Sequence, residues 1–531
     1  MPHVVIVGGG LAGLSLATKL VGRGEDWTVT VIEAQEKVGG RMTKEDISWE
    51  GGSASIDLGG QWVGPTHRLL LSLLKDLGLS VFPSPSEGNS ILCFSRRTYF
   101  FEGTIDFAWM DGYEGKRPDF SPEVAEDFRQ GWEKFCQLRD VLPRGKRPTE
   151  REWRSLDDET MGAWIERTFT TEEAKEYFRA ETRFIGPLGP ADPSQTSLLN
   201  CAFAQVIAPQ GEEPEEFLVD GGMGQIPLML RESLEKSGRA TVRSGCVVTE
   251  VEVVEGGGKG GVRVWISRES ESIKADVVAL CIPPSRLSRL VFHPALPARH
   301  TTLFQRFPQG TCCKFLAVYD RPFWREKRLS GNSFFCSPDV LFEATADASK
   351  PGKPSGVLAV FIVGDLYFRW KKQFEGVETE KDPERRKSLE TARNRVVLEE
   401  LSRFYGEEAL SPKAVVLGDW PANQFVGGAY SGHATPGTLT TVGEALGEAV
   451  GGRLFFGGTE TALRWAGYLE GALESAERRA LFRLWKSLST TMMTNFLTSR
   501  YRWTWVDVLS EVNEAPGAGA QDPPAVVEEN T

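Results

Sequence analysis

A glycine-rich turn near the N-terminus is the first place where residue type and spacing predict chemistry. Gly8, Gly10 and Gly13 follow the apolar run 4–7 and open a stretch of helical character that reaches about Leu20. The first glycine permits the tight turn, the second lets the backbone approach a pyrophosphate, and the third allows close packing of helix on strand. The helix N-terminus adds free N–H groups and a positive dipole end. The turn therefore predicts a phosphate-binding site.

A carboxylate lies where a dinucleotide would need it. Glu33 ends the second strand-like segment, 27–32, and stands 20 residues after Gly13. A carboxylate at this position accepts hydrogen bonds from ribose hydroxyls in dinucleotide-binding βαβ units. The strand, turn, helix and acidic residue together predict a Rossmann-like domain, but they do not separate FAD from NAD.

The bulk composition limits the class of protein. A chain of 531 residues is long enough for at least two domains, and its 40% hydrophobic and 25% charged residues are typical of a globular protein. The net charge of −12 argues against nucleic acid as a partner, because phosphate-binding surfaces are normally basic.

The cysteines and histidines predict no metal site and a reducing compartment. The eight cysteines form no CxxC pair, and the five histidines lack metal-ligand spacing. No secretory signal is visible, and no window supplies the ~20 apolar residues of a transmembrane helix. We therefore expect a cytoplasmic location.

Four further segments resemble the flavin monoamine oxidase family. They are 39–41 (GGR), 57–66 (DLGGQWVGPT), 219–225 (VDGGMGQ) and 456–472 (FGGTETALRWAGYLEGA). The glycines of 57–66 would let the backbone pass close to a flat ring. The helix that begins near residue 469 would direct its N-terminus at the pyrimidine edge of a flavin. The resemblance covers roughly 1–85 and 215–485, and it implies that the cofactor is FAD.

The resemblance also implies which residues contact the FAD. They are Gly8, Gly10, Leu11, Ala12, Gly13, Glu33, Ala34, Gly40, Arg41, Gly59, Gly60, Gln61, Trp62, Val247, Gly458, Thr459, Glu460 and Leu469. Thr459 and Glu460 would lie near the ribityl chain. Ala429 occupies the position at which many animal members carry a flavin-linking cysteine. Alanine cannot form a thioether, so noncovalent FAD is expected.

Three residues are implied to act in catalysis. Tyr430 and Tyr468 match the family's aromatic cage, which would hold a neutral amine with its α-carbon toward the flavin. Lys314 matches the lysine that hydrogen-bonds a water facing the flavin N5, where it could stabilise charge as electrons pass to oxygen. A lysine at a strand edge that reaches solvent is the structural alternative.

The implied fold is α/β with an α+β insert. A Rossmann-like FAD-binding domain would comprise 1–85, 215–300 and 420–485, and an interleaved substrate-binding domain 86–214 and 301–419. A C-terminal extension would follow at 486–531, disordered from about 514. Peripheral membrane contact through the Trp-rich segment 481–509 is an alternative to packing on the body.

The implied reaction is oxidation of primary or secondary amines, with hydride transfer from the α-carbon to the flavin. The products would be an imine or aldehyde and hydrogen peroxide, with molecular oxygen as the electron acceptor. A homodimer is a possible oligomeric state. An L-amino-acid oxidase would need a pocket arginine, for which Arg183 is a candidate, and a polyamine oxidase would need acidic residues along a tunnel. An inactive flavin-binding interaction protein is the alternative of another class.

Overall fold

A computed structural model describes residues 1–22, 27–94, 96–102, 120–184, 190–208, 214–254, 260–337 and 339–478. The chain divides into two compact units, Met1–Leu484 and Trp485–Thr531, and every described residue belongs to the first. The interpretations made above for 481–531 therefore lie outside the described residues.

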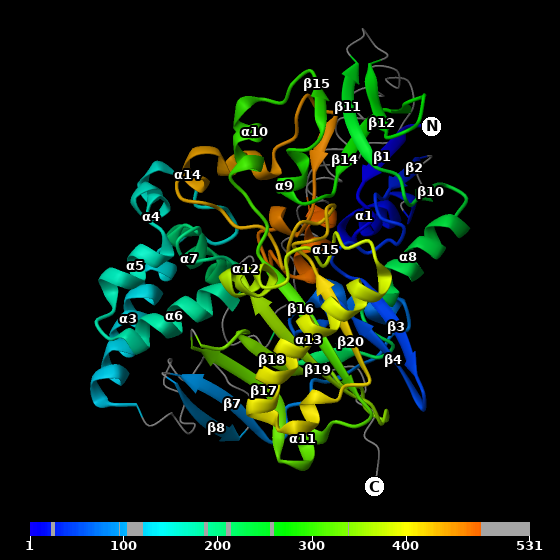
Figure 1. Ribbon diagram of the computed structural model, residues 1–531. Coiled ribbons are helices and arrows are strands. Elements are labelled where there is room, and N and C mark those ends of the chain that lie inside the picture. The colour runs from blue at the N-terminus through cyan, green and yellow to red at the C-terminus, as the bar shows by residue number, and fades with distance from the viewer. Residues whose placement is uncertain are drawn as a thin grey trace, which may run out of the picture. The chain divides into compact units, whose positions relative to one another are not determined.

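A parallel sheet carries the glycine turn (Figure 1). The N-terminal apolar run forms its central strand, and parallel neighbours pair on both sides. The strand order is β10 (Ala240–Arg243), β2 (Thr28–Ile32), β1 (His3–Val7), β14 (Val277–Leu280) and β21 (Leu454–Phe456). Helix α1 (Leu11–Gly22) follows β1 and contacts α8 (Gln225–Lys236) and α15 (Leu469–Arg478). Segments from both ends of the first unit thus meet at the carboxyl edge of this sheet.

A second sheet of seven strands is antiparallel except for one parallel pair. Its order is β20 (Ala414–Asp419), β16 (Cys312–Tyr319), β19 (Gly356–Val363), β18 (Ala344–Asp347), β17 (Leu329–Cys336), β7 (Asn89–Phe94) and β8 (Arg97–Glu102). Strand β16 is buried along its whole length between β20 and β19. Its odd-numbered residues share a core with α12 (Gly364–Lys372) and α13 (Pro383–Tyr405). Because side chains alternate along a strand, Lys314 points to the opposite face.

The helices that follow β8 in the sequence form a cluster beside the second sheet. They are α3 (Pro122–Asp140), α4 (Arg154–Asp158), α5 (Met161–Thr168), α6 (Glu172–Phe184) and α7 (Leu198–Ile207). Their packed faces are rich in aromatic rings, among them Phe128, Tyr177 and Phe178. Helix α6 contacts both β17 and β19, which brings its C-terminal turn over the second sheet.

Smaller elements connect these parts. The short sheets contain β13 (Ile273–Ala275), β12 (Gly261–Ile266), β11 (Val248–Val254) and β15 (Val291–His293), then β5 (Trp62–Val63), β9 (Phe217–Val219) and β6 (Val81–Pro83), and the hairpin β3 (Lys44–Trp49) and β4 (Gly52–Asp57). The remaining helices are α2 (Arg68–Asp76), α9 (Pro284–Leu287), α10 (Ala298–Gln305), α11 (Phe323–Glu326) and α14 (Leu439–Val442). Among the described helices, none has both the length and the apolar character that crossing a bilayer requires.

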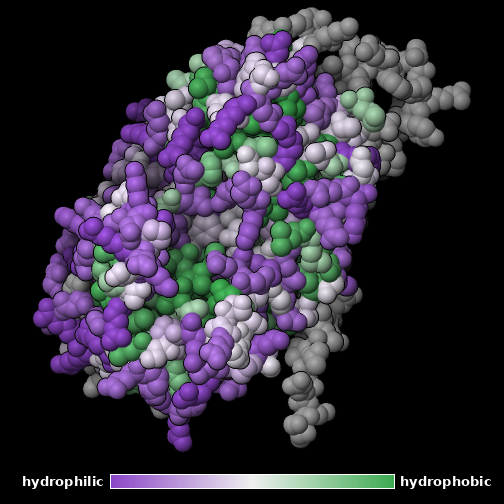
Figure 2. All heavy atoms as spheres, turned by 45° about the vertical axis from the view of Figure 1, so that its right-hand side comes forward, coloured by the Kyte–Doolittle hydropathy of each residue, from purple (hydrophilic) through white to green (hydrophobic). Residues whose placement is uncertain are grey.

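The surface is largely hydrophilic on the face drawn in Figure 2, where hydrophobic residues gather in a hollow near its centre. The described part of the chain brings no three His, Cys, Asp or Glu side chains together as a possible metal site.

Candidate active site

One cavity of about 1330 Å³ extends from the glycine turn to the second sheet. Every predicted site residue lines it except Gly13 and Glu460. We call the part lined by the glycine turn, Glu33 and α9 the dinucleotide end. The part lined by the two predicted cage tyrosines, the second sheet and α6 is the substrate end. Motifs that are hundreds of residues apart therefore face one space.

The three glycines of the turn are needed for different physical reasons. Gly8 has a φ of 107°, and a Cβ on it would lie 2.5 Å from the carbonyl oxygen of Cys281. A Cβ on Gly13 would lie 2.0 Å from the carbonyl oxygen of Gly8, so this glycine lets α1 pack on the turn without facing the cavity. A Cβ on Gly10 would meet no protein atom nearer than the Gly39 carbonyl oxygen at 3.9 Å. The open space before Gly10 and the start of α1 fits the diphosphate of FAD.

Glu33 is held in place by backbone donors. Its Oε2 accepts a hydrogen bond from the N–H of Gly9 at 2.7 Å, and its Oε1 accepts one from Gln35 at 2.9 Å. Burial raises the pKa of Glu33 above its usual value, and these hydrogen bonds offset the shift only in part. A carboxylate oxygen can accept more than one hydrogen bond, so the group retains capacity for ribose hydroxyls at the cavity wall.

Arg286 was not predicted from the sequence, yet it lines the dinucleotide end. Its Nη1 donates to the carbonyl oxygen of Gln424 at 3.2 Å, as does Arg289 at 3.0 Å. The buried Nε of Arg286 has no acceptor among the described residues. Burial and the neighbouring Arg289 charge lower the pKa of Arg286. Two adjacent guanidinium groups at an open cavity favour an anion, and the diphosphate of FAD is one.

Arg41 and Glu460 form a buried ion pair behind the cavity wall. The Nη1 of Arg41 donates to Glu460 Oε1 at 2.7 Å and to the carbonyl oxygen of Tyr430 at 2.8 Å. Burial opposes ionisation of Glu460, but the Arg41 guanidinium overcomes it and lowers the pKa of that carboxyl. Thr459 lines the cavity, whereas Glu460 does not, so the motif's glutamate acts by holding Arg41 and the loop of Tyr430.

Lys314 is buried in mid-sheet, which rules out the strand-edge alternative. Its Nζ donates to the carbonyl oxygens of Asp57 and Gly59, each at 3.0 Å, and to Gln61 Oε1. Burial lowers the pKa of Lys314 to about 8. An ammonium has three donors, so all three have protein acceptors, and the water bond implied by the family resemblance would have to replace one of them.

The Gln61 amide takes its orientation from this lysine. Because an ammonium cannot accept a hydrogen bond, the amide must present Oε1 to Lys314 and turn Nε2 away. That Nε2 is buried and has no acceptor among the described residues, while Gln61 lines the cavity. A donor without a protein acceptor at this wall fits a bound polar ring such as the isoalloxazine.

Tyr430 and Tyr468 reach the cavity from separate loops. The Tyr430 ring lies 6.4 Å from that of Phe361, and the Tyr468 ring lies 5.1 Å from that of Trp465. Burial raises the pKa of both phenols, so both remain protonated. Ala429 lines the cavity beside Tyr430 and offers no thiol.

The substrate end also holds residues that no motif indicated. Glu181 on α6 and the aromatic side chains Phe184, Phe334 and Phe361 line it. Arg183, the candidate for binding a substrate carboxylate, does not line the cavity and instead forms a buried ion pair with Glu343. The amphipathic helix at 172–184 could be recognised from its sequence, but the direction of each side chain depends on the packing of α6 on β17.

Comparison with known proteins identifies the family of the chain. The family described as flavin containing amine oxidoreductase matches residues 11–480. An L-amino acid dehydrogenase of Synechocystis sp. is 38% identical over 90% of this chain and 93% of its own length. A probable flavin-containing monoamine oxidase A of Dictyostelium discoideum is 28% identical over 93% and 99% of the two chains.

Solved structures agree in fold. Putrescine oxidase bound to putrescine superposes with a TM-score of 0.75 at 25% identity, covering 91% of this chain and 99% of that one. Cyclohexylamine oxidase from Brevibacterium oxydans gives 0.74 at 25% identity with the same coverage. The chain belongs to the flavin-containing amine oxidoreductase family, which confirms the predicted fold class and flavin cofactor. It is an enzyme of flavin-dependent amine oxidation.

Proposed function

We propose that this enzyme oxidises amines that carry no carboxylate beside the nitrogen, with noncovalently bound FAD and with oxygen as electron acceptor. The observation that carries the proposal is the charge of the substrate end. Its described charged lining includes the carboxylates of Glu181 and Asp347, the latter paired with Arg325, and the cation Lys314, whose donors all have protein acceptors. Such a surface favours an amine and disfavours an amino acid.

The carboxylate Glu215 adds to this electrostatic preference. It is exposed, yet it lies close enough to raise the pKa of both cage tyrosines and of Lys314. Arg183 is held by Glu343 and is not available to bind a carboxylate in the cavity. A carboxylated substrate would therefore meet negative charge, and Lys314, the cation of this end, has no donor left to bind its carboxylate.

The residues of the cavity would place the amine and exclude water, and FAD, when bound, would supply the acceptor for the hydride of the α-carbon C–H bond. Tyr430 and Tyr468 would present ring faces to an amine, and both phenols remain neutral because burial raises their pKa, so neither competes as a base. Lys314 holds the loop 57–61 through two carbonyl oxygens and one amide oxygen. Its positive charge would also stabilise negative charge that develops on oxygen.

The relatives leave both the substrate and the electron acceptor open, since one similar protein is named an L-amino acid dehydrogenase. Lys314 supports oxygen because its ammonium is buried beside the cavity at neutral pH. The absence of a thiol at residue 429 supports noncovalent FAD, and acid precipitation that leaves flavin on the protein would contradict it.

The test compares substrates that differ by the carboxylate alone. Purified protein reconstituted with FAD is assayed with 2-phenylethylamine against phenylalanine, and with cadaverine against lysine. We expect kcat/KM to be at least about 100-fold higher for each amine, the size of an uncompensated buried charge. Equal or higher values for the amino acids would contradict the proposal. The electron acceptor is tested by comparing the peroxide yield in air with the turnover that an added quinone supports in the absence of oxygen. If no amine were turned over under either condition, the inactive flavin-binding alternative would be favoured.

A further inference from the structure

Glu181 lies at the far end of the aromatic wall from the cage. The wall runs from Tyr430 to Phe361 at 6.4 Å between ring centroids, and from Phe361 to Phe184 at 5.4 Å. Glu181 is three residues before Phe184 on α6, so the two side chains share a face of the helix. Both line the cavity. The carboxylate is therefore separated from the cage by an apolar stretch.

No cation among the residues that the structure describes faces this carboxylate. Among the described residues, none donates a hydrogen bond to Glu181 and none forms an ion pair with it. The titratable groups that interact with it are Cys201 on α7 and Cys336 on β17. Burial raises the pKa of both thiols, so they carry no charge. Burial alone raises the pKa of Glu181 to about 7.

The fully buried carboxylates of the described chain, unlike the partly buried Glu181, all have partners. Glu460 pairs with Arg41. Glu343 pairs with Arg183, which lies on the same helix as Glu181, two residues further along. Asp347 receives hydrogen bonds from Trp324 and Arg325, and Glu33, Asp157 and Glu470 accept hydrogen bonds from backbone or hydroxyl donors.

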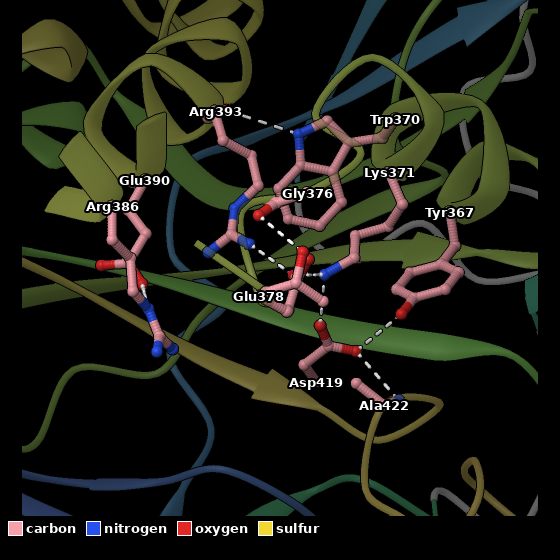
Figure 3. Close-up of polar contacts among 11 residues, drawn as sticks. Tyr367, Trp370, Lys371, Gly376, Glu378, Arg386, Glu390, Arg393, Asp419 and Ala422 are labelled. Carbon is pink, nitrogen blue, oxygen red and sulfur yellow. Dashed lines mark hydrogen bonds and ion pairs between the residues drawn. The ribbon is translucent and has the colours of Figure 1, made fainter. Parts of the chain in front are cut away.

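The contrast is clearest in the ionic cluster of Figure 3, where α12, α13 and β20 meet. Lys371 contacts both Glu378 and Asp419, and Arg393 donates to Glu378 at 2.9 Å. Tyr367 donates to Asp419 at 2.9 Å. Each charge in that cluster is balanced within the protein, whereas no described cation balances Glu181, which lines the cavity.

We propose that Glu181 binds a second positive charge on the substrate, so that the enzyme prefers amines with an ammonium or guanidinium group at the other end of an apolar spacer. The proposal rests on the proposed amine oxidation and names its substrate class. The reacting nitrogen lies between the tyrosines, the spacer lies along Phe361 and Phe184, and the distal cation pairs with the carboxylate. Glu181 is then a residue that determines specificity.

The kinetic test uses Glu181→Gln, which keeps the shape of the side chain and removes its charge. Straight-chain diamines and the monoamines of equal length are compared. We expect kcat/KM for diamines to fall about 10- to 100-fold, mainly through KM, and that for monoamines to change by less than about 3-fold. Glu173→Gln removes the same charge from the first turn of α6, outside the cavity lining, and should leave both values unchanged.

Two outcomes would overturn the inference. One is equal loss for diamines and monoamines, which indicates general damage to the cavity. The other is no loss for diamines, which indicates that Glu181 remains a neutral acid in the complex. Glu181→Asp keeps the charge and should recover part of the diamine preference, and flavin content and Tm report whether each variant is folded.

A binding test separates this inference from the proposed function. Hexamethonium, which carries two quaternary ammonium groups, is compared with hexyltrimethylammonium by titration calorimetry on the FAD-loaded protein. An aromatic cage accepts a trimethylammonium group by cation–π contact, and neither compound can be oxidised at a free amine. We expect the bis-cation to bind about 10-fold more tightly in the wild type and equally in Glu181→Gln. This result would stand even if no amine were turned over, and equal wild-type affinities would refute the inference.

Discussion

The two ends of the cavity have opposite electrostatic character. At the dinucleotide end, the start of α1 and the Arg286 side chain line the space and bring positive charge to it. At the substrate end, the Glu181 carboxylate faces it without a cation. Each end therefore offers a charge opposite to that of its proposed ligand, an anionic diphosphate at one and a cationic amine at the other. Opposite charges at the two ends of one space favour a single orientation of cofactor and substrate.

The largest effect is expected from a pair of glycine substitutions that separates cofactor binding from folding. Gly10→Ala places a methyl group in open space, so the apoprotein should keep its Tm while the Kd for FAD rises about 100-fold, because the methyl group overlaps the diphosphate position. Gly13→Ala places it 2.0 Å from the Gly8 carbonyl oxygen and should lower the Tm of the apoprotein. Thermal unfolding without FAD and flavin titration measure the two effects. Tight FAD binding by Gly10→Ala would contradict the position assigned to the diphosphate.

A smaller effect is expected from a substitution of Lys314, which lies where the two ends of the cavity meet. Lys314→Met should slow the reaction of the reduced enzyme with oxygen about 30-fold and slow its reduction by amine much less, because the positive charge acts on the oxygen step. The pKa of Lys314 is lowered to about 8, so the ammonium is present below that pH and is lost as pH rises through it. The wild-type oxygen reaction should therefore decline above pH 8, and the variant should show no such decline. Stopped-flow measurement of both half-reactions against pH tests this, and an unchanged oxygen reaction would exclude the role.

The smallest effect is expected from a substitution of Arg286 at the dinucleotide end. Arg286→Gln should raise the Kd for FAD about 10-fold and leave the preference for diamines over monoamines unchanged, because one charge-assisted hydrogen bond is lost at the dinucleotide end alone. Arg299→Gln removes a surface charge that pairs with Glu448 and serves as the control. A change in substrate preference without a change in FAD affinity would mean that the two ends are not divided as described.

The dinucleotide end could be predicted in detail from the sequence. The glycines at 8, 10 and 13 and the carboxylate at 33 are spaced within one βαβ unit, so their chemistry follows from local geometry. The motifs at 57–66 and 456–472 identify the family, because aromatic residues and glycines occur there in a fixed order. Their residues then line the same cavity, apart from Glu460, which supports Arg41 from behind.

The substrate end could not be predicted in the same way. Glu181 and Arg183 lie two residues apart on one helix, and nothing in their sequence distinguishes them. The fold directs Arg183 to Glu343 on the second sheet and leaves Glu181 facing the cavity. Similarly, the alternation of β16 directs Lys314 toward the cavity, but its three acceptors come from a loop some 250 positions earlier.

The order of residues is enough to specify a phosphate-binding turn, because the conformations that glycine permits and the start of a helix are properties of neighbouring residues. The balance of buried charge is not such a property. Whether Glu181, Arg286 or Lys314 has a partner depends on which distant segments fold against it, since a buried charge is compensated by whatever group lies within a few ångströms in space. Packing of α6 and of β16 on their neighbouring strands decides that compensation, and with it the charge that we propose for the substrate.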